Sequence, residues 1–331
     1  MRVDYFVMKS EFERVLEKYG LGGEDGELCA RLFASSSLDG VYSHGLNRFP
    51  SFIRSIESGI VDVEKRAVKT LSLGALERWD GRRGPGPLNA AAATMRAVEL
   101  ARQYTVGVVG LSNTNHWMRA GSYGIMAAES ECIGIMWTNT MQNMPCWGGM
   151  ERKIGNNPAV FAVPHNGSVV LLDSAMSMFS YGKLDRLMRD GRQTPVDAGY
   201  DRNGNVTRNP ADVIESMLVM PMGFWKGSGL SILLDLIAST VSGGLSTSDV
   251  GKGPETGVSQ FFCAIDLSAF PDRKEIDDRI EHTLSDIRSS VPRDPGHPVH
   301  IPGEGMERTR EENLREGIPV DEDVWNEVCS M

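Results

Sequence analysis

The sequence predicts a mixed α/β fold in which helices from both ends of the chain flank a central α/β region. Three observations lead to this prediction. The first 60 residues carry helical apolar spacing, strand and helix signals alternate from Val106 onward, and the last part of the chain returns to helices. At 331 residues the chain is long enough for two lobes. We divide it into 1–75, 76–270 and 271–331, and expect the third part to pack with the first.

Each element follows from a local pattern. Apolar spacing and stop signals predict the helices, and short apolar runs predict the strands. The helix from Ser228 is apolar nearly all round and is therefore expected to be buried. A capping box at 10–13 is expected to open the first helix, 11–19. The other predicted helices are 25–38, one from near Leu46, 88–104, 121–131, 228–243, 272–290, 307–317 and 323–328. The predicted strands are 106–111, 132–138, 159–164, 168–173 and 259–267.

The bulk composition is that of an ordinary soluble protein. Of its residues 41% are hydrophobic and 24% are charged, and 44 acidic against 34 basic side chains give a net charge of -10. This balance disfavours nucleic acid as a partner. The N-terminal stretch lacks the apolar core of a signal peptide, no segment approaches the length of a membrane span, and five scattered cysteines do not fit a disulfide framework. We expect a cytoplasmic protein without a membrane partner.

The stretch DGVYSHGLNRFP, 39–50, places a serine, a histidine and an arginine just ahead of a predicted helix. Gly45 lets the backbone bend, and Arg48 lies about one turn further on, so Ser43, His44 and Arg48 can face a common space. A proton-transfer group beside a guanidinium that binds carboxylates suits a small acidic substrate. The alternative is that His44 and Arg48 only cap and solvate the start of the helix.

A second histidine and arginine follow the predicted strand 106–111. The run SNTNHWMRAGSYG places His116 and Arg119 between the end of that strand and a glycine-flanked helix. Ligand-contacting groups in α/β folds often lie at such a strand end. The alternative is a loop histidine whose hydrogen bonds are satisfied within the fold.

Two glycine-framed loops are candidates for contact with a phosphate-bearing ligand. In PMGFWKGSGLS, glycines surround Trp225 and Lys226 at a helix start, so that backbone N–H groups and a positive charge are available together. IPGEGM, 301–306, opens a helix in a similar way. Each loop has the alternative of being a flexible turn before a helix.

Several common catalytic patterns are rejected. GRRGPGPLNA, 81–90, is the nearest match to a Rossmann fingerprint, but prolines interrupt its turn and the preceding LERWD is a poor buried strand. A serine hydrolase is rejected because the adjacent Ser43 and His44 cannot easily form the nucleophile-to-base hydrogen bond, and because no G-x-S-x-G elbow is present. The remaining histidines match no familiar ligand spacing, so we expect no catalytic metal.

Taken together, these motifs occur in the order seen in one protein family. The chain resembles the malate/L-lactate dehydrogenase family essentially from end to end, through SHGLNRFP, NHWMRAGSYG, WTNTMQNMPCWGG, IGNNP, LLDSAMSMFSYG, GFWKGSG and PGE followed by NLREGIPVDEDVW. This family is distinct from the Rossmann-fold dehydrogenases of similar names. The resemblance implies a non-Rossmann, L-sulfolactate/malate dehydrogenase-like α/β fold, an intertwined homodimer, and NADH between loops of the central lobe, with NADPH as the alternative.

The resemblance also implies roles for individual residues. On the family pattern, His44 is the acid/base that protonates the keto oxygen of the substrate as hydride reaches the carbon. Ser43 orients the substrate, Arg48 grips its carboxylate, and His116 lines the same pocket, where it shares or competes for the proton-transfer role. The implied cofactor-binding residues are Val169, Val170, Leu171, Leu172, Asp173, Ser174 and Ala175, then Trp225 and Lys226, and then Gly303, Glu304 and Gly305.

The substrate is inferred from finer likenesses within the family. Trp117, the paired Trp137 and Trp147, and the DSAMSMFSYGKL segment imply the reduction of 2,3-diketo-L-gulonate to 3-dehydro-L-gulonate. The chain departs from many relatives at Asn156, where they have threonine, and at Trp117-Met118, where they have Phe or Tyr plus Gly. The second departure is expected to reshape the pocket and argues against malate and lactate. The alternatives are a dehydrogenase of malate, lactate or ureidoglycolate on the same fold, and a sugar-acid binding protein without a cofactor.

Overall fold

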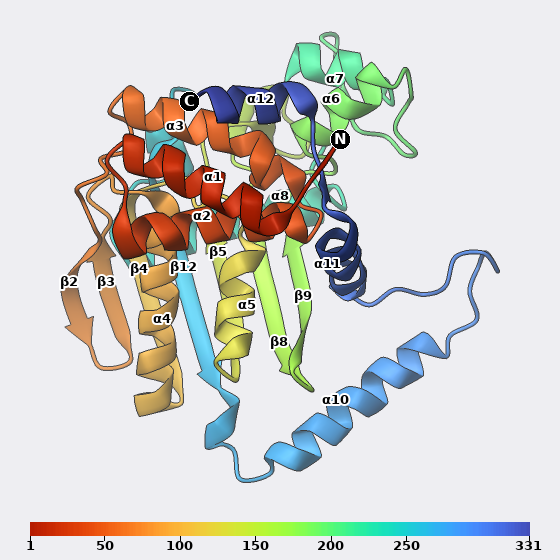
Figure 1. Ribbon diagram of the computed structural model, residues 1–331. Helices are drawn as coiled ribbons and strands as arrows, with labels where there is room; N and C mark the ends of the chain where they lie inside the picture. Colours follow the sequence, from red (N-terminus) through yellow and green to blue (C-terminus); the bar gives the residue numbers. More distant parts are fainter.

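A seven-stranded mixed sheet forms the centre of the computed structural model, which describes residues 1–331 (Figure 1). The strands lie in the order β2-β3-β4-β12-β5-β8-β9, and β3 with β4 is the single parallel pair. A Rossmann sheet is mostly parallel, so this order confirms the non-Rossmann α/β prediction. The strands are β2 (Val68–Leu73), β3 (Leu76–Asp80), β4 (Val106–Asn115), β5 (Cys132–Thr138), β8 (Ala159–His165), β9 (Ser168–Ser174) and β12 (Thr256–Asp266).

Helices cover both faces of this sheet (Figure 1). α4 (Gly86–Tyr104) and α5 (Gly121–Glu129) pack on one face, and α8 (Trp225–Ser242) packs on the other. Successive side chains of a strand point to opposite faces, and β12 shows this division. Phe262 lies in the apolar cluster under α4 and α5, whereas Phe261 packs in the cluster that includes α8.

The two ends of the chain build one helical layer. β1 pairs with β13 in antiparallel fashion, and one apolar cluster joins the first three helices with the last one. Within it the rings of Phe12 and Phe49 stack at 4.1 Å, and Trp325 is buried against the same group. The elements are β1 (Arg2–Val3), α1 (Tyr5–Lys18), α2 (Gly23–Leu38), α3 (Phe49–Glu57), β13 (Ile318–Pro319) and α12 (Glu322–Ser330).

The remaining elements lie around this frame. α10 leaves the body of the protein as an arm, and Leu284 is its one buried side chain (Figure 1). None of the helices is both long enough and apolar enough to cross a membrane. These elements are β6 (Met144–Pro145), β7 (Arg152–Ile154), α6 (Tyr181–Arg189), β10 (Gly199–Tyr200), β11 (Val206–Thr207), α7 (Pro210–Ser216), α9 (Thr247–Val250), α10 (Arg273–Arg288), α11 (Glu304–Glu316), and 3-10 turns at Tyr42–His44, Leu46–Arg48 and Leu267–Ala269.

Asp39, at the end of α2, ties three parts of the chain together. Its side chain is fully buried and accepts hydrogen bonds from Arg119, in the loop after β4, and from Nε of Arg310 on α11 at 2.7 Å. The Arg119 side chain is only 4% exposed. Buried charges are tolerated when they are paired and hydrogen-bonded. The three side chains therefore fix the end of α2 against the sheet and against α11.

The prediction that the first helix opens at a capping box at 10–13 is wrong. α1 begins at Tyr5, because the Asp4 side chain accepts hydrogen bonds from the N–H groups of Phe6 and Val7. Asp4 is thus the N-cap residue, and a carboxylate in this position satisfies N–H groups that have no partner within the helix. The helix therefore begins almost two turns earlier than its apolar spacing predicts.

The segment LERWD, judged a poor buried strand, forms β3 within the sheet. Its Glu77 is buried, and the carboxylate accepts two hydrogen bonds from Arg96, at 2.9 and 3.0 Å, and one from Nε1 of Trp79 at 2.9 Å. Hydrogen bonding to Arg96 lowers the pKa of Glu77 to about 2. A carboxylate can occupy this sheet position because a bidentate arginine compensates its burial.

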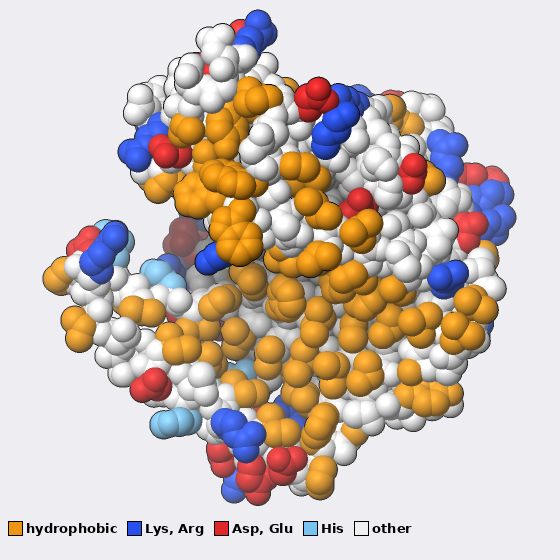
Figure 2. Space-filling model, turned by 180° about the vertical axis from the view of Figure 1, so that it is seen from behind, with side chains coloured by type: hydrophobic (Ala, Val, Ile, Leu, Met, Phe, Trp, Pro, Cys, Tyr) orange, Lys and Arg blue, Asp and Glu red, His pale blue; other side chains and the backbone are white.

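α8 is not the fully buried helix that its composition predicts. Its outer side is solvent-accessible, and Trp225, Leu233 and Leu236 are 64%, 56% and 52% exposed. Orange side chains gather over this region on the back of the molecule (Figure 2). Contiguous apolar patches of this kind mark interaction surfaces. The patch, called the α8 face below, consists of Trp225, Leu230, Ile232, Leu233, Leu236 and Ile237.

We expect Asp39→Ala to lower the free energy of unfolding by about 3–5 kcal/mol, because it leaves the buried Arg119 guanidinium unpaired. Urea unfolding followed by circular dichroism measures this loss. Asp185→Ala is the matched control, since it removes the partner of Arg189 in an exposed pair on α6, and its expected cost is below about 1 kcal/mol. Equal losses in the two variants would contradict the role given to Asp39.

Candidate active site

A cavity of about 950 Å³ lies where the N-terminal helical layer meets the sheet. This volume is at the upper end of the range for small-molecule sites. The 3-10 turns after α2, the loop after β4, strand β9 and the start of α11 all contribute to its wall. Its lining includes His44, Arg48, His116, Asp173, Glu255 and Gly303. The structure thus brings the two predicted histidines into one site.

His44 is held by a tight turn. The N–H of Leu46 donates to Oγ of Ser37 at 2.8 Å, and Gly45 lies so close to Ser37 that a Cβ there would overlap it. Within the turn, Oγ of Ser43 lies 3.0 Å from Nδ1 of His44. The expectation that these adjacent residues cannot hydrogen-bond is therefore wrong, because 3-10 geometry brings them together. Nε2 of His44 makes no hydrogen bond within the chain.

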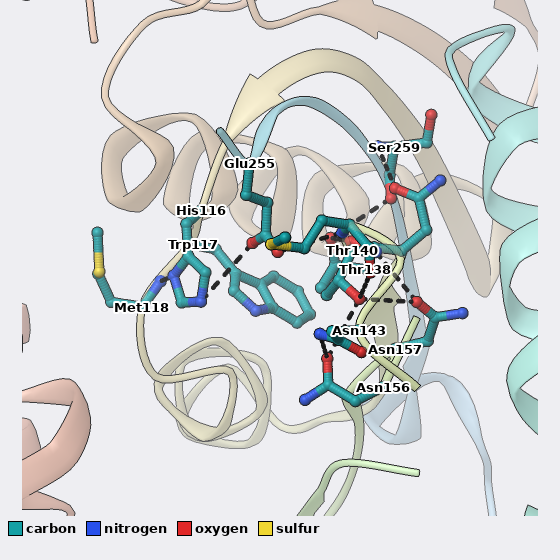
Figure 3. A network of polar contacts seen from close by, with 12 residues as sticks. His116, Trp117, Met118, Thr138, Thr140, Asn143, Asn156, Asn157, Glu255 and Ser259 are labelled. Atoms are coloured by element: carbon teal, nitrogen blue, oxygen red, sulfur yellow. Dashed lines mark hydrogen bonds and ion pairs between the residues drawn. The ribbon is translucent and has the colours of Figure 1, made fainter. Parts of the chain in front are cut away.

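His116 is held in one tautomer. The N–H of Met118 donates to Nδ1 of His116 at 2.9 Å, so Nδ1 is an acceptor and the proton of the neutral ring lies on Nε2. Nε2 is 3.9 Å from Oε1 of Glu255 (Figure 3). The ring stacks on that of His44 with centroids 6.0 Å apart and an interplanar angle of 19°. His116 thus presents a hydrogen-bond donor beside His44.

Burial and positive charge keep both histidines neutral. Burial, followed by the charges of Arg48 and Arg119, lowers the pKa of His44 to about 4. Burial also holds the pKa of His116 well below its ordinary value, and Arg48 and His44 act in the same direction. Burial raises the pKa of Glu255 against the opposing effects of the Met141 N–H and of Arg48. Arg48 and Arg119 thus place positive charge beside the histidines, and this charge favours an anion there.

Arg48 and Arg119 differ in their availability to a ligand. The Arg48 side chain lines the cavity and has no hydrogen bond or ion pair within the chain. The Arg119 guanidinium is paired with Asp39, and its Nη2 donates to Sδ of Met306 at 3.0 Å. His116 and Arg119, the second histidine–arginine pair of the sequence, therefore have different roles. His116 lines the cavity beside His44, whereas Arg119 forms an ion pair with Asp39 at the end of α2.

Strand β9 and the start of α11 form the part of the wall where the cofactor loops were predicted. Gly303 approaches β9 so closely that a Cβ would lie 3.2 Å from the backbone N of Leu171 and the backbone O of Val169, and its φ of 97° is suited to glycine. No atom lies within 4 Å of a Cβ built on Gly305. The backbone at Gly305 is therefore open to a ligand, whereas Gly303 packs against β9. Of the predicted cofactor residues, those that line the cavity are Leu171, Asp173, Ala175, Gly303 and Gly305.

Trp225 and Lys226 are not among the residues that line the cavity. They begin α8, where the Lys226 ammonium lies 5.9 Å from the centroid of the Trp225 ring. The preceding residue, Phe224, has a φ of 62°, and such backbone strain in a side chain larger than glycine is typical of functional loops. Oγ of Ser174 lies 3.8 Å from Sδ of Met222, so this loop does reach the end of β9.

Sequence reasoning missed a set of polar residues in the cavity wall. Thr140, Asn143, Asn156 and Glu255 all line the cavity. In Figure 3 Glu255 lies near His116, and Asn143 and Asn156 face each other at the other end of the same network. The departure at Asn156 was the one signal that could have indicated them. No local pattern marks Glu255, because it comes from the loop before β12, remote in sequence from the histidines.

Of the departure at Trp117-Met118, only Met118 lines the cavity. Trp117 is 1% exposed, and its ring stacks on Tyr123 at 5.4 Å and meets the edge of Phe262 at 5.8 Å. It belongs to the apolar cluster under α4 and α5. Met118, the other half of the departure, does line the cavity, with a φ of 65°. The sequence places the two side by side, but the bend at Met118 directs Trp117 into the core.

The chain matches the malate/L-lactate dehydrogenase family over residues 3–329. It belongs to this family. Among its relatives, the 2,3-diketo-L-gulonate reductases of Mannheimia succiniciproducens and Haemophilus influenzae are each 46% identical over 333 residues, and the alignments cover 100% of both chains. The reductase of the same name from Escherichia coli is 42% identical over the same length.

Solved structures agree with this family assignment. The sulfolactate dehydrogenase of Methanocaldococcus jannaschii has a TM-score of 0.91 and 28% identity, covering 100% of this chain and 97% of that one. The malate dehydrogenase of Pyrococcus horikoshii has a TM-score of 0.90 and 30% identity, covering 100% and 95%. The sulfolactate/malate dehydrogenase-like fold is therefore confirmed.

Membership of the malate/L-lactate dehydrogenase family makes the chain an oxidoreductase that interconverts hydroxy acids and keto acids with a nicotinamide cofactor. The cavity fits this chemistry. The open backbone at Gly305 is available to the cofactor, and the unpaired Arg48 is available to a carboxylate. The two histidines supply groups that can exchange or donate a proton near the carboxylate site.

An anion bound at Arg48 is expected to raise the pKa of His44 from about 4 towards its ordinary value near 6.5, because it neutralises the positive potential that opposes protonation. Binding of L-gulonate at about pH 6 should therefore take up protons. Histidine NMR titration with and without the acid measures the shift, and His282, exposed on α10, is the internal reference. A pKa of His44 that stays near 4 with the ligand bound would contradict this expectation.

Proposed function

We propose that this protein is an NADH-dependent reductase that converts 2,3-diketo-L-gulonate to 3-dehydro-L-gulonate, with His44 as the proton donor. The observation that carries the proposal is the free guanidinium of Arg48 in one cavity with two neutral, stacked histidines. The names of the relatives at 42–46% identity over the whole chain support the substrate. The cavity volume leaves room for a sugar acid beside a cofactor.

The keto acid enters as an anion, and its carboxylate pairs with Arg48. A bidentate arginine pair fixes both the position and the plane of a carboxylate. This pairing offsets the charge of Arg48, which together with burial lowers the pKa of His44, so that the imidazole takes up a proton more easily when the substrate is in place. Ser43 holds Nδ1 of His44, which leaves Nε2 for the keto oxygen.

The bound nicotinamide supplies the hydride that reduces the keto carbon. As negative charge develops on the keto oxygen, His44 transfers its Nε2 proton to that oxygen and returns to the neutral form. His116 carries a proton on Nε2 in its fixed tautomer and donates a hydrogen bond within the pocket. We assign it the positioning of the substrate, because its Nδ1 is engaged by the Met118 N–H and cannot accept a second proton without breaking that bond.

The cofactor is proposed to lie along β9 and the start of α11. The segments 169–175 and 303–305 lie beside each other, and their backbone groups are proposed to contact the cofactor. The Glu304 side chain caps the second segment by accepting a hydrogen bond from the Ile301 N–H at 3.0 Å. Trp225 and Lys226 are proposed to join them from the start of α8, where an aromatic ring and a positive charge are exposed. We propose NADH as the cofactor of the reaction.

We expect His44→Ala to lower kcat for the reduction of 2,3-diketo-L-gulonate by about 10²–10⁴, the usual contribution of a general acid, while NADH still binds. Absorbance at the NADH band measures turnover, and quenching of tryptophan fluorescence measures binding. His282→Ala, on the exposed arm α10, is the control. Turnover of His44→Ala close to that of the unmodified enzyme would remove His44 from the mechanism.

We also propose that two chains associate through the α8 face. A soluble chain rarely exposes a helix side this apolar, and within α8 the charged side chains are only Lys226 and Asp235. Homo-oligomers are most often twofold symmetric, so one patch can cover its copy. Because Trp225 belongs both to this face and to a proposed cofactor loop, the contact is expected to border the cofactor site.

Leu233→Glu together with Leu236→Glu is expected to convert a dimer into a monomer, because it places two charges in the centre of the α8 face. Sedimentation velocity should give twice the mass of one chain for the unmodified protein and a single mass for the double variant. Exposed changes away from this face, such as Met188→Glu on α6, should leave the mass doubled. A monomeric unmodified protein would refute the proposed contact.

The compartment is proposed to be the cytoplasm. All five cysteines are free thiols in the structure, and Cys29 and Cys132 are fully buried. Burial raises the pKa of both thiols above their ordinary value. Unpaired, protonated cysteines of this kind suit a reducing environment.

A further inference from the structure

A polar network in the cavity wall is left without a role by hydride and proton transfer. Nδ2 of Asn143 donates to Oδ1 of Asn156 at 2.8 Å, and Oγ1 of Thr140 lies 3.1 Å from the same oxygen (Figure 3). The three side chains line the cavity that contains His44. They come from the loop after β5 and from the IGNNP loop before β8, which meet here.

The fold fixes the IGNNP loop so that Asn156 is presented to the cavity. The neighbouring Asn157 is fully buried, and its Oδ1 accepts from the Thr140 N–H at 3.0 Å while its Nδ2 donates to the Ser231 backbone O at 2.9 Å. Gly155 packs so tightly that a Cβ would overlap Asn157 and Thr140. Asn157 therefore anchors the loop, and Asn156 is half-buried at the cavity surface.

The asparagine pair does not satisfy its own hydrogen-bonding capacity. Oδ1 of Asn143 is shielded from solvent and has no donor. Nδ2 of Asn156 makes no hydrogen bond within the chain, although its Oδ1 is engaged by two side chains. A pair with a purely structural role would be expected to have these groups paired. The unpaired acceptor and the unpaired donor belong to two amides that contact each other in the cavity wall. Hydroxyl groups, which are both donors and acceptors, can pair with groups of both kinds.

The network continues from the asparagines to the proton-transfer site. Thr140 is followed by Met141, whose N–H donates to Oε2 of Glu255 at 3.2 Å, and Oε1 of Glu255 lies 3.9 Å from Nε2 of His116. One run of polar groups thus extends from beside the histidines to the asparagine pair (Figure 3). A substrate held at its acid end near Arg48 can lie along this run.

We propose that Asn143 and Asn156 recognise hydroxyl groups at the end of the substrate remote from its carboxylate, and so select polyhydroxylated acids over unsubstituted ones. This inference rests on the proposed function for the orientation of the substrate, and it extends that function to the specificity of the pocket. Thr140 contacts Asn156, and Glu255 lies between the Met141 N–H and His116 in the same wall. The asparagines are specificity-determining residues and take no part in proton transfer.

The test compares two acids of equal carbon number, L-gulonate and 2-hydroxyhexanoate, which differ in the hydroxyl groups beyond the second carbon. Both are titrated calorimetrically into the NADH complex, in which no turnover occurs. The unmodified protein should bind L-gulonate about tenfold or more tightly than 2-hydroxyhexanoate, because two or more hydrogen bonds are gained. Asn143→Val and Asn156→Val should each reduce that preference by about three- to tenfold, mainly through weaker binding of L-gulonate.

Two further variants keep the result interpretable. Asn156→Thr retains a hydroxyl next to Thr140 and should lose less of the preference than Asn156→Val, and it replaces the valine variant if that one does not fold. Asn203→Val, in an exposed turn, is the matched control and should keep the preference of the unmodified protein. NADH binding, measured by fluorescence, confirms that each variant has an intact cofactor site.

The outcomes separate this inference from the proposed function. Equal weakening of both acids in the asparagine variants, or equal binding of both acids by the unmodified protein, overturns the role of the asparagines. A third outcome is that the protein prefers L-gulonate through Asn143 and Asn156 without reducing 2,3-diketo-L-gulonate. That result supports the role of the two asparagines in specificity and rejects the proposed substrate.

Discussion

The buried carboxylate of Asp39 is the constraint on which the site depends. It pairs with Arg119 from the loop after β4 and with Arg310 from α11, and so joins segments that are far apart in the sequence. His44 follows Asp39 by a single 3-10 turn, and His116 precedes Arg119 by three residues. The ion pairs therefore set the distance between the two histidines, and they hold α11 with its glycine loop against β9.

Within this frame, the chemistry follows from an imbalance of charge. Arg48 is left unpaired in a cavity where burial keeps both histidines neutral. The positive charge of Arg48 favours an anion, and an anion at Arg48 makes protonation of His44 less unfavourable. Binding of the acid and protonation of His44 are thereby linked. In the proposed mechanism, the carboxylate that promotes protonation of His44 also orients the carbonyl group that receives the proton.

The sequence predicted local features more reliably than contacts between distant segments. An apolar run located β5, and an alanine-rich segment located most of α4. The spacing in SHGLNR placed Ser43, His44 and Arg48 at one helix start. Strand β3 was judged poor because the arginine that neutralises Glu77 lies in another element. Glu255 and Asn143 reach the cavity from separate loops, and no periodicity links either of them to His44. The exposure of α8 was missed because composition does not reveal which apolar side the rest of the chain fails to cover.

The central claim is that one cavity orients an acid between Arg48 and His44, with the hydroxylated end of the acid beside Asn143 and Asn156. A crystal structure of the complex with NADH and L-gulonate tests this claim most directly. It should show the carboxylate on Arg48, the C2 hydroxyl within hydrogen-bond distance of Nε2 of His44, the nicotinamide ring against the opposite side of C2, and the remaining hydroxyls at Asn143 and Asn156. A sugar acid whose carboxylate lies away from Arg48, with His44 out of reach of the C2 oxygen, would contradict the account.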